Sequence, residues 1–183
     1  MTNEQQASIV KPKAKVYIDG ANVFYAQKDI GFSIDWIKMK NYLSEKWDIL
    51  EIRYYVGLKE KDEKMTSYLR YLDAIGITSI TKPLKVIKID NNHPLARLKN
   101  FTEIYKCNFD VEMTTDILLD RTNIDEIILF SGDSDFNYLA QKLRNAGKDI
   151  MVFSSRKMLS WELKLTTKRY VFLEDLKDKI ARN

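Results

Sequence analysis

Short apolar runs rich in β-branched residues recur along the chain and predict strands. The run Asp149–Ser154 is continuous, which is typical of a strand that is buried on both faces of a sheet. Ile77–Ile89 is also strand-like, but Pro83 interrupts it, so we expect an edge strand or an irregular hairpin there. The other predicted strands are Lys15–Asp19, Leu50–Leu58, Asp125–Phe130 and Tyr170–Leu173.

Between these runs, apolar residues recur at the spacing of a helix with one buried face. The segment Glu60–Ile75 carries such a stripe, and Gly76 is expected to end it. A second helix is expected at Asn108–Leu119, and its sheet-facing residues are predicted to be Val111, Thr114, Thr115 and Leu118. Further helices are predicted at Asp35–Trp47, Phe136–Ala146 and Ser160–Thr167, and from Glu174 onward.

The alternation of strands and helices predicts right-handed βαβ units. Such units build an α/β fold with a mostly parallel central sheet and helices on both faces. The 183 residues suit one domain, which we place at residues 14–183 after a disordered tail, residues 1–13. No repeat, linker or second domain is expected.

Composition narrows the class of protein. With 45% hydrophobic and 31% charged residues and no long apolar run, the chain is typical of a soluble protein without membrane contact. The polar N-terminus lacks the apolar block of a signal peptide, and the single Cys107 fits a reducing, cytoplasmic environment. With one histidine, His93, a His-built zinc site and a Ser-His-Asp triad are disfavoured.

The net charge of +4 is mild, but its distribution is uneven. Lysine and arginine crowd residues 82–106 and 144–169, on either side of an acidic segment. An acidic centre within basic surroundings suits a metal-dependent enzyme that acts on a polyanion. For any single lysine, the simpler reading is a solvated helix face.

Two acidic tips follow predicted strands. Asp19 ends the run Val16–Ile18, and Asp133 and Asp135 follow a buried run that ends at Phe130. Parallel strands would bring these carboxylates to one edge of the sheet, where open α/β folds bind ligands. Because like charges so close together repel, a divalent cation is the usual remedy.

Each of these residues also has an ordinary explanation. Asp19 suits an Asx-turn or a helix cap as well as a metal ligand, and Asn22 suits either a cap or a ligand contact. One of the downstream pair can cap the following helix. We favour Asp133 as a ligand and Asp135 as a cap or a second ligand.

A third acidic segment opens the helix at Asn108–Leu119. Asp110 at its start can point toward the sheet edge. Asp116 either turns inward to the site or shares an exposed face with Asp120, and we weigh the two equally. Lys106 can contact a phosphate or neutralise the acids. The chain contains neither a P-loop nor a G-x-G-x-x-G motif, so no nucleotide cofactor is indicated.

Three motifs in order resemble the LabA-like branch of the NYN domain family, within the PIN-like ribonucleases. They are Ile18–Asn22, then Lys106–Asp116, then Ser131–Phe136. The resemblance spans about residues 15–173. Cys107 departs from it by standing where the family often has glycine, and Lys168 departs by standing where it often has aspartate.

The resemblance implies a PIN-like three-layer αβα sandwich and RNA cleavage that depends on Mg²⁺ or Mn²⁺. It implies Asp19, Asp110 and Asp133 as metal ligands and catalytic residues, with Asp116 and Asp135 as supporting ligands. Expected substrate contacts are Asn22, Lys106, Ser131 and Lys168.

We therefore hypothesise a metal-dependent endoribonuclease acting on single-stranded or structured RNA. The alternatives are a non-catalytic RNA-binding or regulatory protein with the same fold, and a phosphohydrolase for a small phosphate ester. A homodimer through Trp36, Trp47 or Tyr54 is a further possibility, although packing of helices on the sheet explains these residues equally well.

Overall fold

The computed structural model describes residues 10–88 and 103–182. Its centre is a six-stranded sheet in the order β3-β2-β1-β6-β7-β8, in which every neighbouring pair is parallel. This confirms the predicted α/β class. The strands are β1 (Lys13–Asp19), β2 (Asp48–Leu58), β3 (Thr78–Pro83), β6 (Glu126–Phe130), β7 (Ile150–Ser154) and β8 (Tyr170–Phe172).

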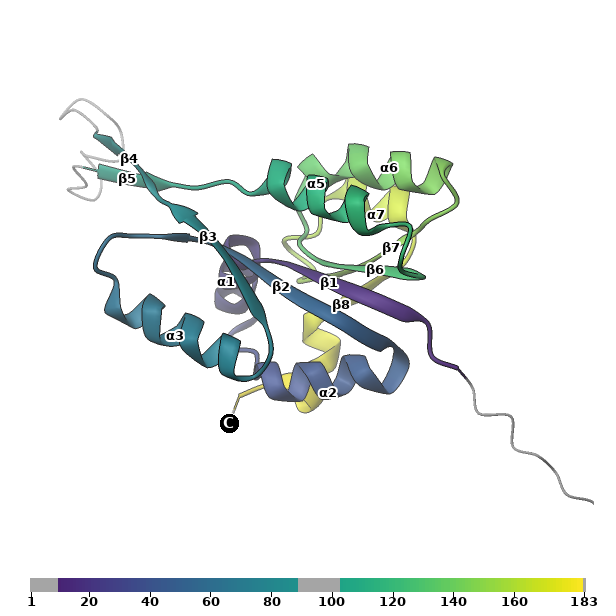
Figure 1. Ribbon diagram of the computed structural model, residues 1–183, viewed down its shortest axis with the longest axis horizontal. Helices are drawn as coiled ribbons and strands as arrows, with labels where there is room; N and C mark the ends of the chain where they lie inside the picture. Colours follow the sequence, from purple (N-terminus) through teal and green to yellow (C-terminus); the bar gives the residue numbers. More distant parts are fainter. Residues whose placement is uncertain (1–9, 89–102, 183) are drawn as a thin grey trace, which may run out of the picture.

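Helices cover both faces of this sheet, so the molecule has three layers (Figure 1). One face carries α1 (Gly20–Ile30), α2 (Trp36–Lys46), α3 (Glu63–Ala74) and α8 (Lys177–Ile180). The other carries α5 (Asp110–Asp120), α6 (Asn137–Asn145) and α7 (Trp161–Thr167). Two short 3₁₀ turns, η1 (Ser134–Phe136) and η2 (Leu173–Leu176), precede α6 and α8.

The period of two along each strand divides the core between these faces. Val16 and Ile18 of β1 pack under the first layer of helices, whereas Tyr17 packs under the second. The aromatic residues proposed for a dimer surface all belong to the first core, because Trp36, Trp47 and Tyr54 are buried there. These buried side chains therefore give no support to a homodimer, which stays a prediction.

The strand order reverses between β1 and β6. From β1 the chain builds outward through β2 to the edge strand β3, and from β6 it builds the other way to β8. Ligands of open α/β sheets bind at the carboxyl ends of the two strands that flank such a reversal. The ends of β1 and β6 carry the Asp19 and Asp133 segments, so the topology places both predicted tips at this position.

Helix α1 was not predicted from the sequence. It starts directly after β1 with Asp19 as its N-cap, and it ends at Gly31, whose φ of 77° is left-handed. Val23 and Ala26 give it a narrow buried face. The capping aspartate and the closing glycine were the available signals.

The segment predicted as an interrupted strand divides at Pro83. Residues up to Pro83 form β3 at the edge of the main sheet, as expected. After the break, β4 (Lys85–Lys88) pairs with β5 (Glu103–Lys106) in an antiparallel hairpin that stands off the sheet (Figure 1). Ile89, the last residue of the prediction, lies outside the described residues, as do residues 1–9 of the predicted tail.

Helix α5 presents a different face from the predicted one. Met113 and Ile117 are buried against the sheet, whereas Val111 is 76% exposed. The reason is a second stripe on the helix, because Asp116 and Asp120 must reach cations on the sheet. The prediction of the sheet-facing residues was therefore wrong for Val111 and Thr115, which are exposed, whereas Thr114 is partly buried and Leu118 packs against the second core as expected.

These cations form an ion-pair network between α5 and the sheet. Arg53 Nη1 lies 3.3 Å from Asp116 Oδ2 and 3.0 Å from Asp120 Oδ2, and Lys15 Nζ lies 2.8 Å from Asp120 Oδ1. Arg53 also bonds both oxygens of Glu51 at 2.8 Å. Bidentate pairs of this kind fix geometry as well as charge. The network anchors the second half of α5 to β1 and β2.

Among residues 10–88 and 103–182, no helix is long and apolar enough to cross a membrane.

Candidate metal and nucleic-acid site

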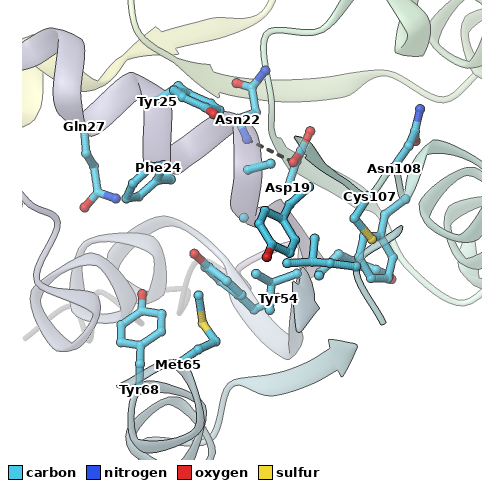
Figure 2. Close-up of a pocket in the computed structure, with 18 of the residues that line it drawn as sticks. Asp19, Asn22, Phe24, Tyr25, Gln27, Tyr54, Met65, Tyr68, Cys107 and Asn108 are labelled. Atoms are coloured by element: carbon cyan, nitrogen blue, oxygen red, sulfur yellow. Dashed lines mark hydrogen bonds between the residues drawn. The ribbon is translucent and has the colours of Figure 1, made fainter. Parts of the chain in front are cut away.

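The end of β1 places Asp19 where the chain turns into α1. Its Oδ1 accepts the backbone N–H of Asn22 at 3.0 Å (Figure 2), and its Oδ2 accepts the hydroxyl of Ser131 at 3.2 Å. Gly20 is required at this turn, because a Cβ there would lie 2.6 Å from the Tyr54 ring and 2.7 Å from the Tyr55 carbonyl oxygen. The cap predicted from the sequence is real, and it holds the carboxylate at the sheet edge.

The end of β6 is tied to the same turn. The N–H of Gly132 donates to Asn22 Oδ1 at 3.0 Å, and the N–H of Asp133 donates to Ser131 Oγ at 3.2 Å. Asp133 in turn caps η1 by accepting the N–H of Asp135 at 3.0 Å. Asn22 and Ser131 therefore join the two strand ends and set the spacing of the carboxylates.

Gly132 permits the close packing of this loop, and we expect Gly132→Ala to destabilise the fold. The added Cβ would lie 2.3 Å from the Met158 carbonyl oxygen and 2.5 Å from Ser154 Oγ. Relieving that overlap should lower the free energy of unfolding by about 1–3 kcal/mol in urea denaturation. Ser134→Ala, an exposed position two residues on, is the control and should change nothing measurable. Equal stability of the two variants would contradict the packing described.

Asp110 reaches the site from α5. The preceding loop orders its backbone, because the N–H of Asp110 donates to Asn108 Oδ1 at 2.7 Å. Asp110 lines the same cavity as Asp19 and Asp133, which places carboxylates from three chain segments around one space.

Burial and neighbouring negative charge raise the pKa values of two of these acids. Burial raises the pKa of Asp19 against the opposing bonds from Asn22 and Ser131, and the charge of Asp133 raises it further. Burial, with the charges of Asp133, Asp135 and Asp19, raises the pKa of Asp110 to about 6.

Asp120 of the ion-pair network behaves in the opposite way. Burial would raise the pKa of Asp120, but hydrogen bonds from Lys15 and Tyr17 hold it below its usual range. The protein therefore neutralises its acids under α5 with its own cations. It leaves those at the sheet edge without comparable compensation, as expected of a site completed by an external cation.

The conformation described is not a closed metal cage. Within residues 10–88 and 103–182, no three His, Cys, Asp or Glu side chains are grouped closely enough to hold an ion together. The donor chemistry nevertheless fits Mg²⁺ or Mn²⁺, which prefer carboxylate oxygens.

Other predicted site residues lie at different distances from this cluster. Lys106, the last residue of β5, lines the cavity, and Asn22 does so as well. Ser131 is fully buried, and its contacts are to the acids rather than to the cavity. Asp135 is exposed beside the cluster and contributes through its charge on Asp110.

Two predicted residues face elsewhere. Asp116 accepts the Tyr55 hydroxyl at 2.6 Å and pairs with Arg53, which makes it part of the ion-pair network. Lys168 ends α7 with a left-handed φ of 56°, just before β8 begins. That is the amino edge of a parallel sheet, opposite the carboxylates. Neither residue is brought to the acids.

The cavity itself, about 970 Å³, was not foreseen. Beyond the acids it runs between α1, α3 and the base of the β4–β5 hairpin, and aromatic side chains line much of it (Figure 2). Cys107 belongs to its rim and packs against Gly57, where a Cβ would lie 2.7 Å from Cys107 Cβ. Gly57 thus leaves room for the Cys107 side chain.

The family model of the NYN domain matches residues 13–174, nearly the whole described domain. The chain belongs to the NYN domain family. This confirms the family inferred from the three motifs and connects the chain to the PIN-like nucleases and to ribonuclease-related function.

Individual relatives agree with this placement. The low amplitude and bright protein LabA of Synechococcus elongatus is 31% identical over 91% of this chain and 87% of its own length. A crystal structure of a protein of unknown function from Vibrio parahaemolyticus has a TM-score of 0.73 at 20% identity, and the match covers 94% of this chain and 98% of that one. The first places the NYN domain in the LabA-like branch, and the second supports the fold alone.

Proposed function

We propose that this NYN domain is a metal-dependent endoribonuclease in which Asp19, Asp110 and Asp133 hold Mg²⁺ or Mn²⁺. The observation that carries the proposal is the convergence of these acids on one cavity at the reversal of strand order, with raised pKa values for Asp19 and Asp110. Family membership adds the connection to RNA.

The bound cation would supply Lewis-acid polarisation of the phosphodiester and favour ionisation of the attacking water. The chain's own residues prepare that site. Asn22 and Ser131 hold the strand ends in register, and the α5 ion-pair network fixes the direction from which Asp110 arrives. Lys64 and Lys106 line the same cavity and would attract the RNA phosphates.

A non-catalytic RNA-binding protein is the second candidate. It is favoured by the capping roles of the acids, since Asp19 and Asp133 already accept hydrogen bonds from neighbouring backbone amides. These caps leave the carboxylates free to bind a further group, because each carboxylate oxygen can accept more than one hydrogen bond. Capping also gives no reason for three acids from separate segments to share a cavity.

Cleavage assays separate the two candidates. The protein is incubated with labelled single-stranded and structured RNA in Mn²⁺, in Mg²⁺ and in EDTA. The proposal predicts internal cleavage in the metal-containing reactions and none in EDTA. Retention of RNA without cleavage under all three conditions would support the second candidate and overturn the first.

The raised pKa of Asp110 gives a prediction for stability in EDTA. A carboxyl whose pKa is higher in the folded state than in the unfolded state stabilises the fold at low pH, and that contribution is lost as pH rises through the folded value. For Asp110 the loss should run from about pH 4 to just above about pH 6.

Asp110→Asn should therefore raise the melting temperature relative to the parent above about pH 7 and give a smaller gain near about pH 4. Adding Mn²⁺ should reverse the order at neutral pH by stabilising only the parent. A difference that does not change with pH or with metal would show that Asp110 does not feel the charge of the cluster.

A further inference from the structure

The cavity extends well past the acids into a region of different chemistry. An ion and one phosphate would need only the acidic end, yet the space continues between α1 and α3. Its further lining is aromatic and apolar, which suits a planar ring better than a sugar-phosphate chain. The residues that give it this character are Phe24, Tyr25, Tyr54, Met65, Tyr68 and Tyr105.

The two of these rings that lie on α1 are exposed although they adjoin an apolar wall. Phe24 is 49% exposed and Tyr25 is 58% exposed, on the first turns of α1 after the capping Asp19 (Figure 2). The Lys28 ammonium lies 4.2 Å from the centroid of the Phe24 ring. Open rings beside a cation form the kind of platform on which unpaired bases stack.

The wall also contains a hydrogen-bond donor. The Tyr68 oxygen accepts the indole N–H of Trp36 at 2.7 Å. A phenol oxygen that accepts a hydrogen bond still carries its own hydrogen to donate. The rings of Tyr54 and Tyr68 both line the cavity, with their centroids 5.9 Å apart. The wall can thus donate to a ring carbonyl or ring nitrogen.

The polar and apolar parts are close neighbours. The charge of Asp19 acts on the Tyr54 hydroxyl and contributes to the raised pKa of that tyrosine, after burial and the contact with Tyr68. Lys64, Lys106 and Arg182 line the same space and supply positive charge for phosphates. A nucleotide with its phosphate at the acids and its base against the aromatic wall meets each of these features.

We propose that the aromatic part of this cavity is a subsite that holds one unpaired nucleobase of the RNA, beside the phosphodiester to be cut. The inference rests on the proposed function and specifies its substrate. A base inside a duplex is stacked and paired on both sides, and it would have to leave the helix to reach this wall.

Binding of short single-stranded RNAs to the Asp133→Asn protein tests this separately from cleavage. In one series a single nucleotide is made abasic at each position in turn. We expect one position at which loss of the base weakens binding at least about fivefold. Phe24→Ala should weaken binding of intact RNA to a similar degree and leave binding of that abasic RNA unchanged. Tyr68→Phe, which removes the hydroxyl alone, should act in the same direction.

Tyr138→Ala is the matched control, because this tyrosine is 68% exposed on α6 and does not line the cavity. In the Tyr138→Ala protein, removal of the base at the sensitive position should weaken RNA binding as much as it does without this substitution. Equal affinity of the parent and Phe24→Ala proteins for intact RNA would overturn the inference, as would cleavage of duplex RNA as fast as of single strands. Base-dependent binding without any cleavage would instead support this inference while the proposed function fails.

Discussion

Asp19→Asn should abolish metal-dependent cleavage and leave the fold intact. Asparagine caps helices as well as aspartate does, so α1 should still begin at residue 20. Burial and the charge of Asp133 raise the pKa of the Asp19 carboxyl group. Replacing this group by a neutral amide therefore relieves repulsion in the absence of metal. We expect the cleavage rate in Mn²⁺ to fall by about 10³-fold or more, and the melting temperature in EDTA to stay equal or rise.

The fall in cleavage rate together with an unchanged or higher melting temperature distinguishes a metal ligand from a structural residue. A purely structural aspartate would lower stability and activity together, whereas a ligand held in place at some cost to stability lowers activity alone. Asp73→Asn, an exposed acid on α3, is the control and should change neither quantity. Undiminished cleavage by Asp19→Asn protein would remove Asp19 from the site.

Arg53→Ala should lower the stability of the fold more than a substitution at any exposed residue named above. The guanidinium is the shared partner of Glu51, Asp116 and Asp120, and only 18% of its side chain is exposed. Removing it leaves three acids facing one another with Lys15 as the remaining cation. We expect the free energy of unfolding to fall by about 2–4 kcal/mol and the melting temperature by about 5–15 °C.

Arg70→Ala is the matched control, since Arg70 is an exposed arginine on α3. Its stability should stay within about 0.5 kcal/mol of the parent. Equal loss in the two variants would show that the network contributes no more than an ordinary surface charge. The Arg53 variant should also weaken metal binding, because α5 would no longer deliver Asp110 from a fixed direction.

The sequence predicted the layered architecture because strong local signals agree with it. Buried parallel strands such as Ile150–Ser154 are continuous apolar runs, and glycine marks the end of α3 at Gly76. Helix α1 escaped prediction because its buried face is narrow and two of its rings are exposed. An irregular hairpin was one of the two structures expected around Pro83, but strand β5 was not predicted, because it lies well after β4 in the sequence and pairing at that distance leaves no local signal.

For the site, the order of the acids along the chain led us to predict Asp19, Asp110 and Asp133 as ligands, and that role remains a prediction. All three end strands or begin helices at the carboxyl edge and line one cavity. Asp116 shares the motif of Asp110 but lies more than a turn along α5, where Arg53 pairs with it. Lys168 lies at the far edge of the sheet. These placements depend on helix rotation and strand direction, which the spacing of a motif does not reveal.

The aromatic wall shows a further limit. Phe24, Tyr54 and Tyr68 come from one strand and two helices, and in the sequence they are indistinguishable from core residues. Tyr54 is indeed 4% exposed and packs in the core, but one side of its ring also lines the cavity.

The most direct test of the account is anomalous diffraction from crystals grown with Mn²⁺. We predict one or two anomalous peaks in the cavity at the ends of β1 and β6, in contact with carboxylate oxygens of Asp19, Asp110 and Asp133, and no such peak in crystals of Asp19→Asn protein. A cavity without an anomalous peak at saturating Mn²⁺, with the three acids still bound only to their neighbouring amides, would contradict it.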